Sequence, residues 1–413
     1  MNKIIKLMLV FCVQLFLFDT VRASSLNLSE ILKIASERNP DLKIQDNEVK
    51  ARENLAEAAG AWKNPEFSIE IERKEDSASN STNSTKFGLS QSFSAFGKFS
   101  EKAEAARAAA KIEKINLSQL ELKIKIDVTA LTFEYAADIE KARHVEERLK
   151  RFQSVYVYIR SRTFASPQKQ TEASIVSSKL LVLQKELIKA KSEVDLTWNR
   201  LNYYLGIKDK ANVKINWIKK EVLLSEASVF EKAQKQNPEL LKLNFELQKN
   251  EAEKSFARKD TWSEFTISGS ISNGSGFAPE KTSSLGLSLP LPVFSKNSLL
   301  AEAQTYRAQA SQIKLDYYRS NLEKFVNSSV IKFKTAQSAV LNFPVSKASE
   351  IEKDFAKSDL GFKKGLVDLV SYLEADAQHF DAITVIYDTQ TEFVQALGEI
   401  TLLTGEFLIP VEQ

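Results

Sequence analysis

The strongest constraint on the fold is an internal duplication, because short motifs recur in the same order at one spacing. Asn39-Pro40-Asp41-Leu42 returns 198 residues later as Asn237-Pro238-Glu239-Leu240. Four further pairs keep that spacing: Glu66-Phe67 with Glu264-Phe265, Gly88-Leu89-Ser90 with Gly286-Leu287-Ser288, Phe96-Gly97-Lys98 with Phe294-Ser295-Lys296, and Ala103-Glu104-Ala105 with Ala301-Glu302-Ala303. An unbroken series in one register indicates a duplicated structural unit. We therefore predict two repeats, over residues 24–220 and 221–413.

The first residues form a separate segment. Lys3 and Lys6 precede an apolar run from Leu7 to Phe18, which is short for a membrane span, and Val21-Arg22-Ala23 offers small side chains for cleavage. This pattern predicts a secretory signal peptide over residues 1–23. Its removal would take away Cys12, the only cysteine, so we expect neither a disulfide nor a thiolate site in the mature chain.

Helix breakers are scarce, which predicts long uninterrupted helices. The chain has only 12 glycines and 9 prolines in 413 residues, and none lies between Ser100 and Arg162. A residue that precedes proline is pushed out of the helical region, so the Asn39-Pro40 pair should interrupt the first helix. The predicted helices run from Ser29 to Ala61 with that break, from Ser100 to about Arg162, from Pro167 to Leu205, from Asn297 with a break at Pro344, and from Val367 to Leu403.

Two apolar stripes run along the longest predicted helix. One contains Ile115, Leu122, Ile126 and Phe133, and the other contains Leu120, Ile124, Val128, Leu131 and Tyr135. Each has the spacing of one helix face, so this helix should contact neighbours on two sides. The charged run from Glu146 to Arg151 is expected to face water or a partner's helices.

Each repeat also carries a pair of alternating segments. We predict strands over about 66–73, 85–94, 264–272 and 283–290, with polar loops between the members of each pair. Alternation occurs in soluble sheets too, but this length and period are also typical of outer-membrane strands. In the second case the lipid-facing residues are Phe67, Ile69, Ile71, Phe87, Leu89, Phe265, Ile267, Leu285 and Leu287, and serine, threonine and glutamate face a wet lumen.

These elements limit the architecture. After residue 24 no stretch approaches 18 apolar residues, so no transmembrane helix is expected. Four strands cannot enclose water, and open strand edges are not tolerated in lipid, so a membrane sheet of this size must share its barrel with copies of itself. The helix that begins at Ser100 would span roughly 90 Å, which suits a periplasmic tube better than a globular core.

The order of these features resembles the TolC-like outer-membrane efflux proteins, closest to the outer-membrane components of heavy-metal and drug pumps of the resistance-nodulation-division class. The most specific segments are the two Asn-Pro motifs, Ala61-Trp62-Lys63-Asn64-Pro65-Glu66-Phe67 and Gly365-Leu366-Val367-Asp368-Leu369-Val370-Ser371-Tyr372-Leu373-Glu374-Ala375. The resemblance implies a mainly α fold with a small membrane β part. It also implies a homotrimer with a shared 12-stranded β-barrel in outer-membrane lipid and a long periplasmic α-helical barrel. The function implied is a passive exit duct joined to a periplasmic adaptor and an inner-membrane pump.

The same resemblance points to residues at the hairpin ends. Glu374 falls where family members place an acidic gate residue, with Ser371 at the companion acidic position, Glu172 as its counterpart in the first repeat and Asp368 as a further candidate. The tips expected to contact an adaptor contain Thr163, Ser166, Gly365 and Leu366. The alternative is that these glutamates are ordinary solvated charges near helix starts. The chain departs from the family pattern at Thr163, where glycine is frequent, and it lacks a lipidated cysteine at the mature N-terminus.

Other functions lack a supporting motif. No glycine-rich phosphate loop or nucleophile elbow occurs, so we expect no enzymatic activity and no bound cofactor. No block of basic residues occurs that would indicate nucleic-acid binding. His144 and His379 are the only histidines, lie in different repeats and are expected to be surface residues, so no metal site is expected. The alternative function is a periplasmic coiled-coil adaptor or scaffold, although such a protein would normally carry one hairpin without this duplication. A third hypothesis is that the chain is a secreted helical enzyme.

Overall fold

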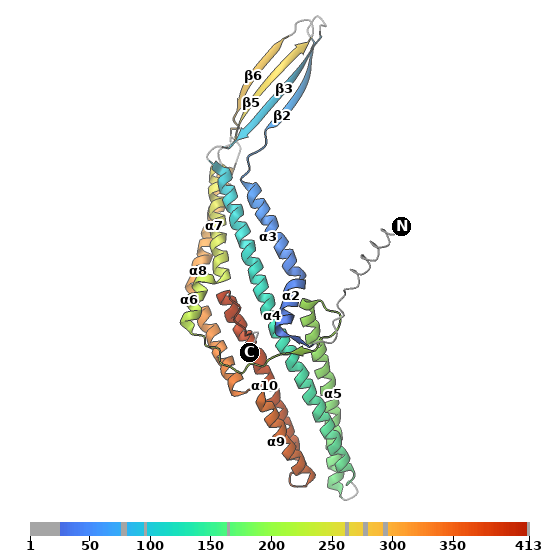
Figure 1. Ribbon diagram of the computed structural model, residues 1–413. Coiled ribbons are helices and arrows are strands. Elements are labelled where there is room, and N and C mark those ends of the chain that lie inside the picture. Colours follow the sequence, from blue (N-terminus) through green and yellow to red (C-terminus); the bar gives the residue numbers. More distant parts are fainter. Residues whose placement is uncertain are drawn as a thin grey trace, which may run out of the picture.

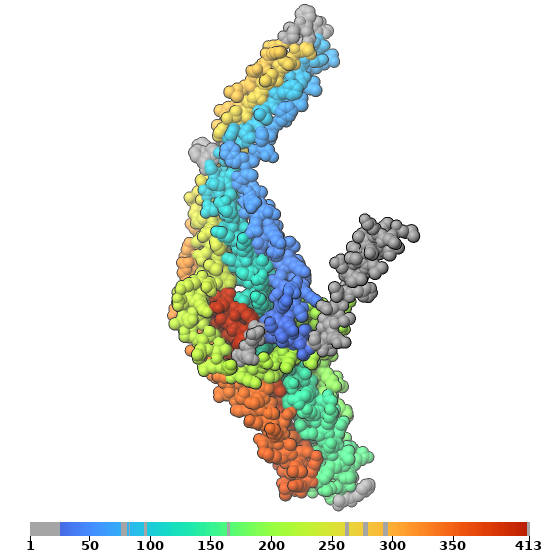
Figure 2. All heavy atoms as spheres, in the orientation of Figure 1, coloured from blue at the N-terminus to red at the C-terminus, as the bar shows by residue number. Residues whose placement is uncertain are grey.

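The computed structural model describes residues 25–75, 81–94, 97–162, 166–260, 264–275, 280–291 and 296–410. The predicted signal peptide lies outside these residues. The molecule is elongated, with a four-stranded sheet at one end and two helical hairpins at the other (Figure 1). In the space-filling view the slender sheet stands clear of the helices (Figure 2).

The predicted helix breaks at the two Asn-Pro motifs are confirmed. Helix α2 (Leu28–Arg38) gives way to α3 (Pro40–Ala59), and α6 (Glu226–Gln236) gives way to α7 (Pro238–Lys259). At each junction a buried asparagine caps the second helix: Asn39 Oδ1 accepts from the amide of Asp41 at 2.8 Å, and Asn237 Oδ1 accepts from Leu240 at 2.8 Å. Proline at the first helical position needs no amide donor, which makes the pair a good helix start.

The long helices form one hairpin per repeat. In the first repeat α4 (Lys98–Arg160) has 63 residues, about 95 Å at 1.5 Å per residue, and α5 (Pro167–Leu205) returns beside it. In the second repeat the outgoing path is divided into α8 (Asn297–Asn342) and α9 (Ser346–Lys363), and α10 (Leu369–Thr404) returns. The break expected at Pro344 is therefore present, because proline lacks the amide that would continue α8.

The helices form a wall with α4 at its centre. Near the sheet the neighbours run α3, α4, α7 and α8, and toward the hairpin tips they run α5, α4, α10 and α9 (Figure 1). The two predicted stripes of α4 are confirmed, since they enter different cores. Leu122, Ile126 and Phe133 pack in a core that includes residues of α8 and α10. Ile124, Val128 and Tyr135 pack in a core with Trp198 and Leu201 of α5.

A linker between the repeats crosses the middle of the wall. It contains β4 (Val213–Lys214), which pairs in parallel with β1 (Leu26–Asn27). Further along, Gln390 of α10 is fully buried, accepts from the Ile218 amide at 2.8 Å and donates to the Ile218 carbonyl at 3.4 Å. These bonds satisfy backbone groups that would otherwise be buried without partners.

The sheet is an antiparallel meander in the order β2, β3, β5, β6. Its strands are β2 (Glu66–Glu75), β3 (Ser81–Phe93), β5 (Phe265–Ser275) and β6 (Lys281–Ser288). The strands extend further into the polar segments than predicted, so residues 81–84 and 273–275 are strand rather than loop. The ladder uses backbone groups, and serine, threonine and asparagine can therefore continue it after the apolar alternation ends.

One glycine sets the distance between two central helices and gives a stability prediction. An added Cβ on Gly398 of α10 would lie 2.6 Å from Cγ2 of Ile126 on α4. Replacing Gly398 with valine should therefore separate α4 and α10 and destabilise the fold by about 1–3 kcal/mol. Thermal unfolding followed by circular dichroism should show a clear drop in the midpoint. Gly269→Val is the control, because the nearest atom to its Cβ is 4.0 Å away. Equal midpoints for the two variants would contradict this packing.

Candidate functional site

The register of the sheet gathers its apolar side chains on one face. Residues opposite each other in antiparallel strands share a face. Phe67 lies opposite Leu89, Ile69 opposite Phe87, and Ile267 opposite Leu287. Phe87 lies opposite Ile271 across the central pair, and Leu285 lies opposite Gly269. We name the face formed by Phe67, Ile69, Ile71, Phe87, Leu89, Phe93, Phe265, Ile267, Ile271, Leu285 and Leu287 the apolar face.

The apolar face of the sheet is more exposed than its polar face, which is the opposite of a sheet in a water-soluble protein. On the apolar face Ile71 is 81% exposed and Leu285 is 84% exposed. On the opposite face of the central strands, the row of serines in β3 and β5 is half-buried. A sheet in water buries its apolar side and wets its polar side. This arrangement is expected where the surroundings of the apolar face are themselves apolar.

Glycines on the polar face are crowded by serine side chains, as expected for the concave face of a curved sheet. A Cβ added to Gly88 would lie 2.5 Å from Ser68 Oγ, and one added to Gly286 would lie 2.7 Å from Ser268 Oγ. Glycine at these positions lets neighbouring strands curve toward each other on the polar side. We therefore take the polar face as the inside of the curve and the apolar face as the outside.

Aromatic rings and ion pairs mark the boundary between sheet and helices. The rings of Phe93 and Phe265 are stacked 5.5 Å apart, and Trp62 meets Phe93 edge to face at 5.8 Å. Below them, the buried Nζ of Lys98 lies 2.8 Å from Asp260 and 3.0 Å from Glu264. Aromatic rings next to charged groups are typical of a membrane–water boundary.

At the other end of the molecule, the two hairpins share one core. Phe152, Val155 and Ile159 of α4 pack with residues of α5, α9 and α10, including Val176, Phe355, Phe362 and Tyr372. The predicted tip residues border this core. Ser166 caps α5 by accepting from the Lys169 amide at 3.3 Å, Gly365 has a positive φ of 74°, and Leu366 is 79% exposed. Thr163 lies outside the described residues.

The predicted gate residues have different local partners. Glu374 is exposed and accepts from Gln378 Nε2 at 2.9 Å. Glu172 is mostly covered, and its carboxylate lies 2.6 Å from Lys169 Nζ. Asp368 caps α10 and accepts from the Ser371 hydroxyl at 2.6 Å, and this hydrogen bond lowers the pKa of Asp368. Asp368 and Ser371 thus have a structural role as a helix cap, whereas Glu374 is free of such a role.

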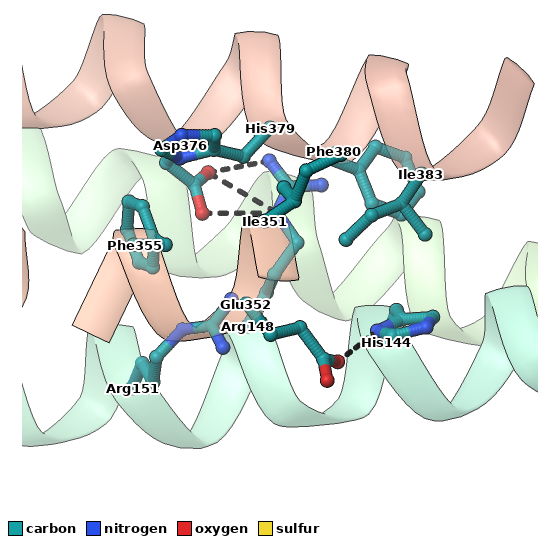
Figure 3. A pocket seen from close by; sticks show the side chains of 10 residues that line it. All are labelled: His144, Arg148, Arg151, Ile351, Glu352, Phe355, Asp376, His379, Phe380 and Ile383. Atoms are coloured by element: carbon teal, nitrogen blue, oxygen red, sulfur yellow. Dashed lines mark hydrogen bonds and ion pairs between the residues drawn. The ribbon is translucent and has the colours of Figure 1, made fainter. Parts of the chain in front are cut away.

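A buried ion cluster, which was not predicted from the sequence, joins the hairpins. Arg148 of α4 is 3% exposed and Asp376 of α10 is 1% exposed, and Arg148 Nη2 lies 2.5 Å from Asp376 Oδ2 (Figure 3). Arg148 Nε also donates to both carboxylate oxygens at 3.1 Å, and Nη1 lies 3.3 Å from Glu186 of α5. The expectation that this charged run faces water is therefore wrong for Arg148.

A signal for this burial was present in the sequence. Arg148 continues the stripe of Val145, Phe152, Val155 and Ile159, which are separated by the three- and four-residue steps of one helix face. A charge on such a stripe is buried with the stripe, and it then needs a partner.

The expectation that both histidines are surface residues is wrong for His144, which is buried, whereas His379 is half-buried. His144 is 3% exposed, and it lines one pocket with His379, Arg151, Glu352 and Phe355 (Figure 3). Donor atoms of His144, Glu147 and Glu352 lie within 4.8 Å of one another. However, Arg143 Nη1 lies 2.7 Å from Glu147 and 3.8 Å from Glu352. Because this guanidinium already neutralises the carboxylates, we assign no cation site here.

Comparisons with known proteins give the fold and a family match over part of the chain. A sequence model of the family described as outer membrane efflux protein matches residues 31–207. No curated protein sequence matches the chain. Among the described residues, no helix combines the length and apolar character needed to cross a membrane.

Several solved structures are similar over nearly the whole chain. CusC is 15% identical with a TM-score of 0.74, and the match covers 94% of this chain and 95% of CusC. The CmeC outer membrane channel of Campylobacter jejuni is 12% identical with a TM-score of 0.74, over 93% and 87% of the two chains. The open state of the MtrE outer membrane channel of Neisseria gonorrhoeae is 16% identical with a TM-score of 0.68, over 94% and 93%.

These findings confirm the predicted fold class, a mainly helical chain with a small β part in which one chain is a repeat unit of an α-barrel and a β-barrel. Two of these solved structures, CmeC and MtrE, are described as outer membrane channels. Residues 31–207 thus match the outer membrane efflux protein family, and the chain as a whole has the TolC-like fold that its sequence predicts.

Proposed function

We propose that three copies of this chain form the exit duct of a tripartite efflux system in the outer membrane, a passive conduit for substrates delivered by an inner-membrane pump through a periplasmic adaptor. The observation that carries this proposal is the sheet whose convex face is apolar and exposed and whose concave face is polar. The family match and the channel fold support it.

Closure by copies follows from the open edges. Strands β2 and β6 each pair on one side only among the described residues. Unpaired backbone groups are too costly in lipid, so β6 of one copy pairs with β2 of the next. With four strands per chain, three copies give the 12-stranded barrel expected for the family, and its lumen is lined by the polar face.

The helical wall has matching open edges. Helix α8 carries exposed apolar side chains at Leu299, Tyr306, Ile313 and Tyr317, and α3 at the other edge exposes Ile44 and Leu55. Head-to-tail contact between unlike edges closes into a ring when the rotation between copies returns to the start. Burial of these two edges against each other would extend the barrel into the periplasm.

The hairpin ends are the proposed gate and the proposed adaptor contact. Leu366 is exposed at one tip, and Glu374 lies about two turns further along α10 with its carboxylate in solvent. In a trimer, three copies of Glu374 and three of Glu172 would converge where the tube narrows. A ring of carboxylates favours cations and repels anions.

Arginine substitutions on the two faces of the sheet test whether the apolar face contacts lipid. Arginine at Ile69 or Leu287 should impair insertion, because arginine facing lipid costs roughly 2–4 kcal/mol near the midplane and less toward the interfaces. Arginine at Ser68 or Ser288, on the same edge strands but on the concave face, should be tolerated. Outer-membrane fractionation with heat-modifiable gel mobility measures both. Equal damage on the two faces would overturn the assignment.

Neutralising Glu374 and Glu172 tests whether their carboxylates line the gate. Glu374→Gln with Glu172→Gln should reduce cation selectivity and weaken block by divalent or trivalent cations in single-channel recordings at low salt. Most of the effect should come from Glu374, because Lys169 already neutralises Glu172. Unchanged selectivity in an intact trimer would leave both residues as ordinary solvated glutamates.

A further inference from the structure

The outer edge of α3 carries a row of three exposed apolar side chains. Ile44 and Leu55 lie on the helix, and Trp62 lies just beyond its C-terminal end. Each of the three is more than half exposed, whereas Val49 and Ala56, on the side of α3 that meets the wall, are buried. Steps of seven and eleven residues keep side chains on one face of a helix. We name Ile44, Leu55 and Trp62 the α3 ridge.

Helix α8 carries a similar row on the opposite edge of the wall (Figure 1). Leu299, Tyr306 and Tyr317 are each more than half exposed, and so is Ile313 between them. They lie on the face of α8 that points away from its buried residues, and therefore away from the rest of its own chain. We name Leu299, Tyr306 and Tyr317 the α8 ridge.

The two ridges have the same spacing. Counted away from the sheet, the steps along the α3 ridge are 7 and 11 residues, and the steps along the α8 ridge are also 7 and 11 residues. Because α3 runs toward the sheet and α8 runs away from it, the two helices are antiparallel when the edges of neighbouring copies meet (Figure 1). One antiparallel register therefore aligns every member of one ridge with a member of the other.

Other registers align fewer of these side chains. A shift of one heptad would place Ile44 opposite Lys324 and leave two members of the α8 ridge without a large apolar partner. In the aligned register Ile313 lies opposite Glu48, whose carboxylate is already paired with Arg52 at 3.1 Å. The aligned register thus covers the exposed apolar groups without placing an unpaired charge among them.

The edge strands of the sheet lead to the same register. Trp62 precedes β2 and Leu299 follows β6, and these are the two strands that pair in the proposed ring. Pro65 before β2 and Pro290 after β6 have no amide to donate, so backbone pairing stops near them. Below that point the seam depends on side chains, and antiparallel pairing of the strands brings Trp62 and Leu299 to the same end of it.

We propose that α3 of one copy packs antiparallel against α8 of the next copy in the register that aligns the two ridges. The contacts are the pairs Trp62 with Leu299, Leu55 with Tyr306, and Ile44 with Tyr317. This inference rests on the proposed function, which supplies the second copy, and adds the register of the seam and the residues that form it. Large apolar and aromatic side chains packed in this way exclude water from the seam and separate the lumen from the outside.

Cysteine cross-linking tests the register directly, because the predicted mature chain has no cysteine. The full-length variant Leu55→Cys with Tyr306→Cys should give covalent trimers on oxidation, which persist on boiling and separate on reduction. A disulfide requires Cα atoms within about 7 Å of each other, and within one chain these positions lie on opposite edges of the wall. Any cross-link therefore joins two copies.

The matched control is Leu55→Cys with Ile313→Cys. Ile313 is exposed on the same face of α8, but it lies one heptad further along, about 10 Å from position 306. The control pair should not cross-link. Cross-linking of the control to an equal or greater extent, or of neither pair in an otherwise intact trimer, would overturn the register.

Alanine variants test the same contact without a new covalent bond. Leu55→Ala and Tyr306→Ala should each lower the temperature at which the trimer dissociates on a gel, and the double variant should lower it by less than the two shifts combined. Leu55→Ala with Tyr317→Ala should be additive, because these positions are about 16 Å apart along the aligned seam. Additive effects for the first pair would contradict the contact.

These results separate the seam from the duct itself. A wild-type protein that never forms trimers would contradict the proposed duct and the seam with it. A stable wild-type trimer whose variants show neither the cross-link nor the coupling would contradict the register and leave the duct standing.

Discussion

The sheet depends on hydrogen bonds and apolar surroundings that a single chain does not supply. Its apolar face exposes Phe67, Ile71 and Leu285, and within the described residues its outer strands β2 and β6 each leave one row of backbone groups unpaired. In water such a sheet would aggregate, and in lipid its edges would be too costly. The proposed ring closure by copies would remove both problems at once. The helical wall has the same two open edges, because its edge helices α3 and α8 are the neighbours in sequence of the edge strands β2 and β6.

Helix α4 connects the sheet to the hairpin tips. It begins beside the aromatic boundary at Phe93 and ends in the hairpin core around Phe152 and Ile159. Its two stripes bind one core on each side, and the buried pair of Arg148 with Asp376 fixes the neighbouring hairpin to it. A buried pair of this kind is costly to break by removing one partner, so it defines a specific arrangement of the hairpins rather than a general attraction. The broken path of α8 and α9 leaves only one helix free to depart from that arrangement.

The elements could be predicted from the sequence because their signals are local. The Asn-Pro caps, the stripes of α4, the break at Pro344 and the alternation in the strands each depend on a few neighbouring residues. The pocket at the hairpin end could not, because it joins Arg148 to Asp376 and His144 to Glu352 across more than 200 residues. A single sequence gives no information on such pairs. Arg148 was still detectable as a charge on an apolar stripe, whereas nothing local distinguished the two histidines from surface residues.

We propose that the structure of one chain is completed only by its copies, and native mass spectrometry of the mature protein released from detergent tests this most directly. We expect a complex of three chains that persists until heating. A monodisperse single chain that stays in solution without detergent would contradict it.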